Sequence, residues 1–149
     1  MDAEWMRMAL EEAQLAADEG EIPVGAVLVK DGKLLARAHN RREADHDPTA
    51  HAELLCMREA AKALGDWRLR GCTLYVTLEP CPMCAGAMVM SQLGRCVYGA
   101  ADEKQGCCGS VYDLPGDPAL AGQTKWESGV MAEACGEMMR TFFAGRRNG

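Results

Sequence analysis

Four residues in two short motifs have the types and the spacing that metal-dependent catalysis needs. His51 and Glu53 lie in the first motif, and Cys81 and Cys84 lie in the second. One imidazole and two thiolates are ligands that Zn²⁺ takes, and a set of three protein ligands leaves a coordination position open for water. These residues therefore predict a catalytic site with one Zn²⁺ per chain, held by His51, Cys81 and Cys84.

Other interpretations of the cysteine pair predict different chemistry. A Cys-x-x-Cys motif alone also occurs in zinc ribbons and in thioredoxin-like redox proteins. A redox role would leave His51 and Glu53 unexplained, and a structural zinc site would need a fourth ligand. The remaining histidines and cysteines could supply one, but none of them lies in a second short ligand pair. We therefore favour a catalytic zinc.

Glu53 is predicted to be the proton carrier of this site. A bound Zn²⁺ lowers the pKa of its water toward about 7, so that hydroxide forms at neutral pH. A carboxylate beside that water can take the proton as general base and later deliver it as general acid. An isolated glutamate would by default be a solvated residue on a helix surface. Glu53 is not isolated, because it follows a predicted metal ligand by two positions.

Length and composition limit the class of protein. The chain has 149 residues, and we expect a single domain over residues 1–149. No apolar run approaches the roughly 18 residues of a membrane helix, and the N-terminus lacks the layout of a secretory signal. We therefore expect a cytoplasmic protein with no membrane segment. The formal net charge of −6 argues against a broad electrostatic nucleic-acid binder, although it allows a local basic site.

Cysteines outside the metal motif are expected to be small buried side chains rather than disulfide partners, because the chain reads as intracellular. This group comprises Cys56, Cys72, Cys96, Cys107, Cys108 and Cys135.

The first half of the chain is predicted to contain two helices and a hairpin. Apolar residues at helical spacing indicate a helix over residues 2–19. Strands at 24–29 and 34–36 flank an Asp31-Gly32 turn, which is typical of a β-hairpin. After a polar, turn-like segment, a second helix is expected to begin at Asp47-Pro48, with Asp47 as its N-cap, and to run to Leu64. This places His51 in its first turn.

The second half is predicted to form a βαβ unit followed by a long loop. Residues 72–78 are an apolar run typical of a strand buried on both faces, a helix is expected over 83–93, and a parallel strand over 96–100. Cys81 and Cys84 would then bracket the first turn of that helix, whose N-terminal partial charge favours thiolate over thiol. Further on we expect a functional loop, an edge strand and a closing helix, at residues 101–122, 124–128 and 131–143.

The flanking sequence identifies a family. The His-x-Glu and Pro-Cys-x-x-Cys pair is the signature of zinc-dependent nucleobase deaminases. Around it, the chain resembles the bacterial tRNA-specific adenosine deaminases over nearly its whole length. The matching stretches are Ile22-Pro23-Val24-Gly25-Ala26-Val27, Asp47-Pro48-Thr49-Ala50-His51-Ala52-Glu53, Leu74-Tyr75-Val76-Thr77-Leu78-Glu79-Pro80-Cys81, Cys84-Ala85-Gly86-Ala87-Met88 and Tyr98-Gly99-Ala100.

This resemblance implies a fold, a reaction and partners. The fold would be a three-layer α/β/α sandwich with a five-stranded mixed sheet, of the cytidine deaminase-like type. The reaction would convert the wobble adenosine of a tRNA anticodon to inosine, with zinc-activated hydroxide attacking C6 of the flipped base and Glu53 as proton shuttle. The partners would be a tRNA anticodon stem-loop and a second copy of the chain in a homodimer.

The resemblance also implies substrate contacts at matched positions. Asn40 and Ala52 would bind the flipped nucleoside, and Asp102 and Lys104 would lie along the RNA path. The end of the last helix would contact RNA through Phe142, Phe143, Arg146 and Arg147. Aromatic faces and cations are what single-stranded RNA recognition requires. An alternative role for Phe142 is packing in the core, and the terminal arginines could be solvated residues.

One departure from the family leaves other substrates open. Where the family usually carries a Phe-Asn-His run that helps hold the anticodon loop, this chain has Leu120-Ala121-Gly122. Together with the acidic net charge, this allows a zinc deaminase of a free nucleobase or nucleoside of the adenine, guanine or cytosine type. A non-catalytic, zinc-stabilised RNA-binding module is a further alternative, but it would give Glu53 no role.

Overall fold

A tight β-hairpin begins the sheet, as the sequence predicts. The computed structural model describes the backbone of residues 1–148 and the side chains of residues 1–146. Strands β1 (Gly25–Lys30) and β2 (Lys33–His39) pair antiparallel, with Lys30 opposite Lys33. Asp31 and Gly32 both have positive φ, at 51° and 74°, which a two-residue hairpin turn of this type requires. The return strand is longer than predicted.

The predicted βαβ unit forms the middle of the sheet. Strands β3 (Cys72–Leu78) and β4 (Arg95–Ala100) are parallel and are connected by helix α4 (Pro82–Met90). The short strand β5 (Lys125–Glu127) adds to β4 in parallel, which confirms the predicted edge strand. The resulting five-stranded mixed sheet has the order β2-β1-β3-β4-β5.

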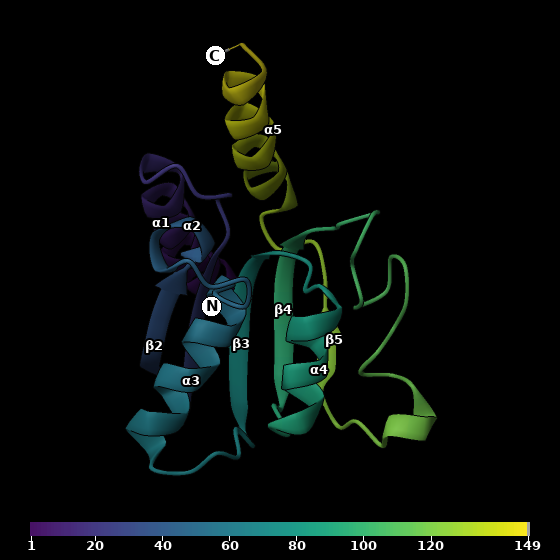
Figure 1. Cartoon of the computed structure of the whole chain (residues 1–149). Helices are drawn as coiled ribbons and strands as arrows, with labels where there is room; N and C mark the ends of the chain where they lie inside the picture. The colour runs from purple at the N-terminus through teal and green to yellow at the C-terminus, as the bar shows by residue number, and fades with distance from the viewer. Residues whose placement is uncertain (149) are drawn as a thin grey trace.

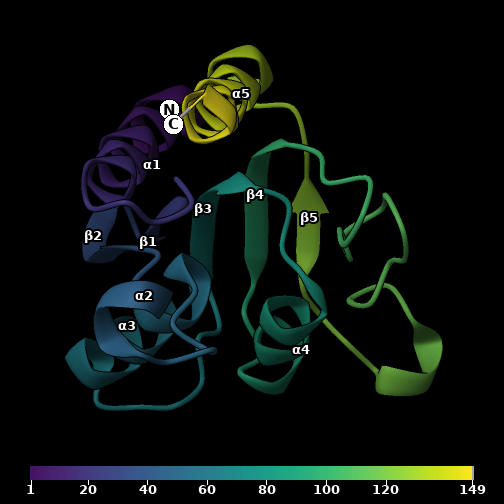
Figure 2. The same ribbon diagram turned by 45° about the horizontal axis from the view of Figure 1, so that its top comes forward.

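Helices cover both faces of this sheet, so the expected three-layer sandwich is confirmed (Figures 1 and 2). Helices α1 (Asp2–Asp18) and α5 (Ala132–Asn148) lie on one face, and helices α3 (Ala52–Leu64) and α4 lie on the other. Successive residues of β1 separate the two cores. Ala26 and Leu28 pack with α3, whereas Val27 and Val29 pack with α1. This alternation follows from the period of two residues in a strand.

The cysteines outside the metal motif are all buried and all carry free thiols, as predicted. None of the helices in the described part of the chain is both long and apolar enough to cross a membrane.

Helix α3 begins later than the sequence predicts, so the proposed start at Asp47-Pro48 is wrong. His51 is the N-cap, with φ −79° and ψ 149°, and the first helical residue is Ala52. Instead of capping a helix, the Asp47 carboxylate accepts hydrogen bonds from the backbone N–H and the hydroxyl of Thr49, at 2.8 and 2.7 Å. Such a local side-chain turn competes with helix formation.

A short helix, α2 (Arg42–Asp45), lies in the segment that was expected to be turn-like. The carboxylate of Glu21 accepts hydrogen bonds from the N–H groups of Glu43 and Ala44 at 3.1 and 2.8 Å, which satisfies part of its first turn. Helix α4 ends at Met90, earlier than expected, and α5 continues to Asn148, beyond the predicted end at residue 143.

Candidate active site

Two helix N-termini bring the three predicted metal ligands together. His51 is the N-cap of α3 and Cys81 is the N-cap of α4, where Pro82 occupies the first helical position. Cys84 projects from the first turn of α4 and is fully buried. His51 Nδ1 lies 3.6 Å from Cys81 Sγ and 3.6 Å from Cys84 Sγ. The His51 side chain makes no capping hydrogen bond to α3, so it is available as a ligand.

The geometry of this His-Cys-Cys cluster fits a tetrahedral zinc ion. Zn–S bonds of about 2.3 Å and a Zn–N bond of about 2.0–2.1 Å, at a tetrahedral angle, place the nitrogen and each sulfur about 3.5–3.6 Å apart. The observed separations of 3.6 Å agree with this value. All three ligand atoms lie within 4.8 Å of one another. The residues present therefore fit the metal that their types predict.

The electrostatics of the cluster favour a thiolate at Cys81. Hydrogen bonding from Cys84 is the main cause that lowers the pKa of Cys81 to about 4, and the neighbouring His51 lowers it further. The same interaction with Cys81, together with burial, raises the pKa of Cys84. Hydrogen bonding to Cys81 raises the pKa of His51. The positive ends of two helices at this point also stabilise negative charge.

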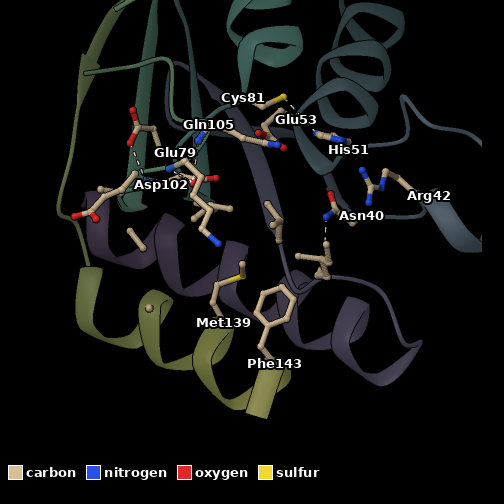
Figure 3. A pocket seen from close by; sticks show the side chains of 18 residues that line it. Asn40, Arg42, His51, Glu53, Glu79, Cys81, Asp102, Gln105, Met139 and Phe143 are labelled. Carbon is tan, nitrogen blue, oxygen red and sulfur yellow. Dashed lines mark hydrogen bonds between the residues drawn. The ribbon is translucent and has the colours of Figure 1, made fainter. Parts of the chain in front are cut away.

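Glu53 lies in the first turn of α3 and faces the same cluster (Figure 3). It is 3% exposed. Burial raises the pKa of its carboxyl group to about 7, against the opposing influence of a backbone hydrogen bond and of His51. A carboxyl group with this pKa both accepts and releases a proton near neutral pH, which suits an acid–base catalyst.

Asn40 connects the pocket to the start of α3. Its Nδ2 donates to the carbonyl oxygen of Ile22 at 3.1 Å, and its Oδ1 accepts from the backbone N–H of Ala52 at 2.8 Å. Ala52 is fully buried and contributes through this amide. One Nδ2 hydrogen of Asn40 is left for a bound molecule, since a side-chain amide carries two donors.

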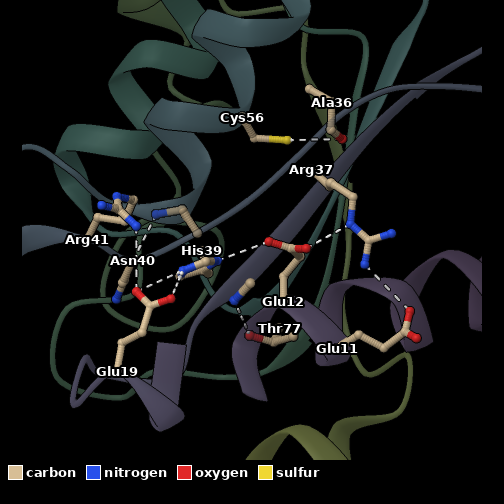
Figure 4. A network of polar contacts seen from close by, with 12 residues as sticks. Glu11, Glu12, Glu19, Ala36, Arg37, His39, Asn40, Arg41, Cys56 and Thr77 are labelled. Atoms are coloured by element: carbon tan, nitrogen blue, oxygen red, sulfur yellow. Dashed lines mark hydrogen bonds and ion pairs between the residues drawn. The ribbon is translucent and has the colours of Figure 1, made fainter. Parts of the chain in front are cut away.

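A network of charged side chains holds strand β2 against helix α1 next to Asn40 (Figure 4). Glu12 accepts from Arg37 Nε at 2.7 Å and lies 3.0 Å from His39 Nδ1. His39 Nε2 lies 3.2 Å from Glu19. The end of β2 that carries Asn40 is thereby tied to α1 at two points.

A cavity of about 540 Å³ opens above the ligand cluster. The structure brings several of the predicted substrate-binding residues to its wall, namely Asn40, Asp102, Lys104 and Phe143 (Figure 3). Asp102 also organises the loop after β4, because its carboxylate accepts from the N–H groups of Lys104 and Gln105 at 3.0 and 3.2 Å.

A second hollow on α5 adjoins the cavity and shares Lys104, Met139 and Phe143 with it. Arg146 lines this hollow, donates to the carbonyl oxygen of Gly20 at 2.9 Å, and lies with its guanidinium carbon 4.8 Å from the Phe142 ring centroid. Arg147 was also predicted to contact RNA, but its side chain lies outside the described residues.

The segment Leu120-Ala121-Gly122 lies away from the catalytic pocket of its own chain. Leu120 ends a short 3₁₀ helix, η1 (Pro118–Leu120), and the backbone of Ala121 is left-handed, with φ 50°. Leu120 and Ala121 line a shallow hollow with Trp67 and Met90, at the C-terminal end of α4. The departure from the family sequence therefore leaves the cavity wall within this chain unchanged.

Sequence reasoning missed several residues of the cavity wall, among them Arg42, Glu79, Gln105 and Met139. Arg42 belongs to the unpredicted helix α2, and Met139 reaches the cavity from the opposite end of the chain (Figure 3). Of these four residues, only Glu79 could have been predicted from the sequence, because it is a carboxylate directly before the Pro-Cys-x-x-Cys motif.

A mixed five-stranded sheet that presents a His-x-Glu motif and a Pro-Cys-x-x-Cys motif at adjacent helix N-termini defines a deaminase of the cytidine deaminase-like class. The model of the MafB19-like deaminase family matches residues 1–143. A tRNA-specific adenosine deaminase of Bacillus subtilis (strain 168) is 51% identical over 142 residues, which cover 95% of this chain and 88% of that protein. The chain belongs to the tRNA-specific adenosine deaminase family.

Two solved structures with deaminase names are similar to this chain. A structure from a study of A-to-I editing by tRNA:A34 deaminases is 42% identical, with a TM-score of 0.88 over 91% of this chain and 98% of that chain. A guanine deaminase from Bacillus subtilis is 40% identical, but it matches only 65% of this chain and 62% of that chain, with a TM-score of 0.62.

Proposed function

We propose that this protein is a zinc-dependent tRNA adenosine deaminase that converts the wobble adenosine of an anticodon to inosine. The observation that carries the proposal is the buried carboxylate of Glu53, which faces a His-Cys-Cys cluster of zinc-ligand dimensions at the base of an open cavity. Relatives and a solved neighbour with high coverage carry tRNA adenosine deaminase names, which supports the substrate. An enzyme with this substrate is expected to act in the cytoplasm.

Metal binding and proton transfer are assigned to different residues of the site. His51, Cys81 and Cys84 would hold one Zn²⁺, which supplies a water of lowered pKa when it is bound. Glu53 would take one proton from that water and transfer it to a ring nitrogen of the base. It would then take the remaining proton of the attacking oxygen and deliver it to the amine, which leaves as ammonia. Burial raises the pKa of this carboxyl group, which favours its acting as an acid as well as a base.

The walls of the cavity would bind the flipped nucleotide. The remaining Nδ2 hydrogen of Asn40 is a donor for an acceptor on the nucleoside. Lys104 and Arg146 supply positive charge along the adjoining hollow, where RNA phosphates would pass. The ring of Phe143 is 37% exposed and offers a stacking face between the cavity and this hollow. These features favour a polynucleotide over a free base.

We further propose that two copies form a homodimer. Trp67, Met90 and Leu120 gather around one hollow and are 56%, 76% and 48% exposed, which is unusual for large apolar side chains on a monomer. A Met90→Glu change at this surface should shift the protein from dimer to monomer in light scattering coupled to size-exclusion chromatography. A monomeric wild type would contradict the proposal.

A deaminase of free guanine is the second candidate, favoured by the identity to the guanine deaminase over part of the chain. The test is to incubate the zinc-loaded protein with an anticodon stem-loop that carries a wobble adenosine, and separately with adenosine, adenine, guanine and cytidine. Hydrolytic deamination exchanges an amino group for an oxygen and so raises the mass by about 1 Da in each case. Inosine in the stem-loop alone supports the first proposal. Turnover of a free compound without inosine in the stem-loop would overturn it.

A further inference from the structure

Glu79 is a second glutamate in the cavity wall, and hydrogen bonds to the protein occupy its whole carboxylate. Oε1 accepts from the N–H of Asp102 at 3.0 Å and from the hydroxyl of Ser110. Oε2 accepts from the N–H groups of Cys108 and Ser110, both at 3.0 Å. A carboxylate has about four acceptor positions, so none remains for a substrate. Glu79 is therefore not a second proton carrier.

These bonds all come from one loop that has little regular structure. Between Ala100, the last residue of β4, and Pro118 the chain forms no helix or strand. The loop must therefore be held by individual contacts. Besides the bonds to Glu79, the N–H of Cys107 donates to the carbonyl oxygen of Pro80 at 2.9 Å.

The loop backbone passes directly over the Glu79 carboxylate. A Cβ atom added at Gly106 would lie 2.2 Å from Glu79 Cδ and 2.4 Å from Oε1. Real Cβ contacts are never this short, so only glycine fits there. Glu79 is itself 2% exposed and sits beneath the loop as its internal support.

Glu79 thus connects two parts of the site. Two positions later in the chain lies Cys81, a ligand of the metal cluster. The loop that Glu79 binds supplies residues 102–105 to the cavity wall, on the side opposite Asn40 and Arg42 (Figure 3). The Glu79 carboxylate therefore makes four of the hydrogen bonds that hold this wall next to the metal-ligand turn, in addition to the bond from Cys107 to Pro80.

We propose that Glu79 is a positioning residue that fixes the substrate-binding wall of residues 102–105 against the turn that carries Cys81. This proposal rests on the proposed function, because it assigns that wall to substrate binding. Without the carboxylate, the N–H groups of Asp102, Cys108 and Ser110 lose their acceptor and the loop is no longer confined to one arrangement. The metal ligands remain in place, because they are positioned by helices α3 and α4.

Two variants test this proposal at different strengths. Glu79→Gln keeps the shape of the side chain but turns an NH₂ group toward the backbone donors. Ser110→Ala removes only the hydroxyl donor. This milder variant can still be measured if Glu79→Gln fails to fold. We expect the KM for the stem-loop to rise about tenfold in Glu79→Gln and about threefold in Ser110→Ala. The kcat should stay within about twofold of wild type, with one zinc per chain.

Ser91→Ala is the matched control, because its hydroxyl donates to the carbonyl oxygen of Met88 at 3.3 Å, away from the cavity wall. It removes a comparable hydrogen bond and should leave KM unchanged. A wild-type KM in both test variants would overturn the proposal. So would a loss of activity that follows a loss of zinc, because that would show a purely structural role.

Hydrogen–deuterium exchange separates this proposal from the proposed function. The amides of residues 102–110 should exchange faster in both test variants, whereas those of α3 and α4 should be unchanged. Unaltered exchange in residues 102–110 would overturn the role of Glu79 even in an active enzyme. Faster exchange would support that role even where the wild type fails to deaminate the stem-loop, an outcome that overturns the proposed substrate alone.

Discussion

The side-chain amide of Asn40 joins the end of the hairpin to the start of helix α3 through the backbone of Ala52. Asn40 Oδ1 accepts from Ala52 N–H at 2.8 Å, and both residues are buried. Ala52 lies between His51 and Glu53, so this bond fixes the turn that presents the predicted metal ligand and the proposed proton carrier. Asn40 thus supports the site as well as lining it.

Asn40→Ala should lower both stability and activity. The buried N–H of Ala52 would lose its acceptor, which costs about 1–3 kcal/mol. For a chain of this size we expect the Tm to fall by roughly 3–10 °C. Deamination of the stem-loop should fall at least about tenfold, because the first turn of α3 is no longer fixed. Calorimetry and steady-state kinetics provide the measurements.

Gln14→Ala is the matched control for Asn40, since it removes a side-chain amide that forms only an exposed bond to Asp18. Its Tm and activity should equal those of wild type. An unchanged Tm in Asn40→Ala would show that the bond to Ala52 contributes nothing to α3.

Glu53→Gln should abolish deamination while the metal remains. The amide has the same shape but cannot carry the proton, and general acid–base catalysis contributes about 10²–10⁴-fold to rate. Zinc content, measured by mass spectrometry of the metal, should stay at one per chain, whereas Cys84→Ala should lose the metal. Full activity in Glu53→Gln would refute the assigned role. A silent Glu53→Gln combined with an unfolded Cys84→Ala would instead favour a non-catalytic RNA-binding module.

Local sequence signals predicted the parts of the fold that short-range forces determine. The Asp31-Gly32 turn and Pro82 at the first position of α4 need no information from the rest of the chain. The start of α3 was mispredicted because Thr49 offered Asp47 a competing partner and because the carbonyl oxygen of Ala50 accepts from the N–H of Arg41 at 3.0 Å. That second bond joins two segments whose proximity the sequence does not reveal.

In the candidate site, too, the sequence predicted the residues of local motifs but not those that distant segments contribute. The His-x-Glu and Cys-x-x-Cys spacings predicted which residues form the His-Cys-Cys cluster, because each motif lies at the start of a single helix. Arg42 and Met139 come from separate helices and meet only in the folded protein. The role of Glu79 depends on how an irregular loop folds back over it, and no periodic pattern encodes such a loop.

Gly25→Ala should be strongly destabilising, and Gly86→Ala should stabilise the protein. A Cβ atom at Gly25 would lie 2.0 Å from the carbonyl oxygen of Ala9 and 2.4 Å from the nitrogen of Ala13, so helix α1 would have to move. Gly86 lies within α4, where an added Cβ meets nothing within 4 Å. There alanine should gain up to about 1 kcal/mol from helix propensity. Urea unfolding of both variants measures the contrast, and equal effects would contradict the close packing of α1.

Asp2 should make a pH-dependent contribution to stability by joining the start of α1 to the sheet. Its carboxylate lies 2.7 Å from Arg95 Nη2 and accepts from the Tyr75 hydroxyl at 2.7 Å. Hydrogen bonding from Arg95, and then from Tyr75, lowers the pKa of Asp2 below its usual value of 3.8. For a lowered carboxyl pKa, the stabilisation is complete above the unfolded value and is lost as pH falls through the folded value.

Asp2→Asn should therefore lower the Tm at pH 7 by about 2–4 °C, which corresponds to roughly 1 kcal/mol in a chain of this length. The difference from wild type should stay constant from neutral pH down to about pH 5 and shrink below the usual carboxyl pKa of 3.8. Glu4→Gln removes a charge from the same helix turn, where Glu4 is exposed, and is the matched control with a smaller effect. Thermal unfolding of both variants and the wild type between pH 3 and 7 measures these Tm differences. A difference for Asp2→Asn that persists in full at pH 3 would show that the carboxylate charge is not its source.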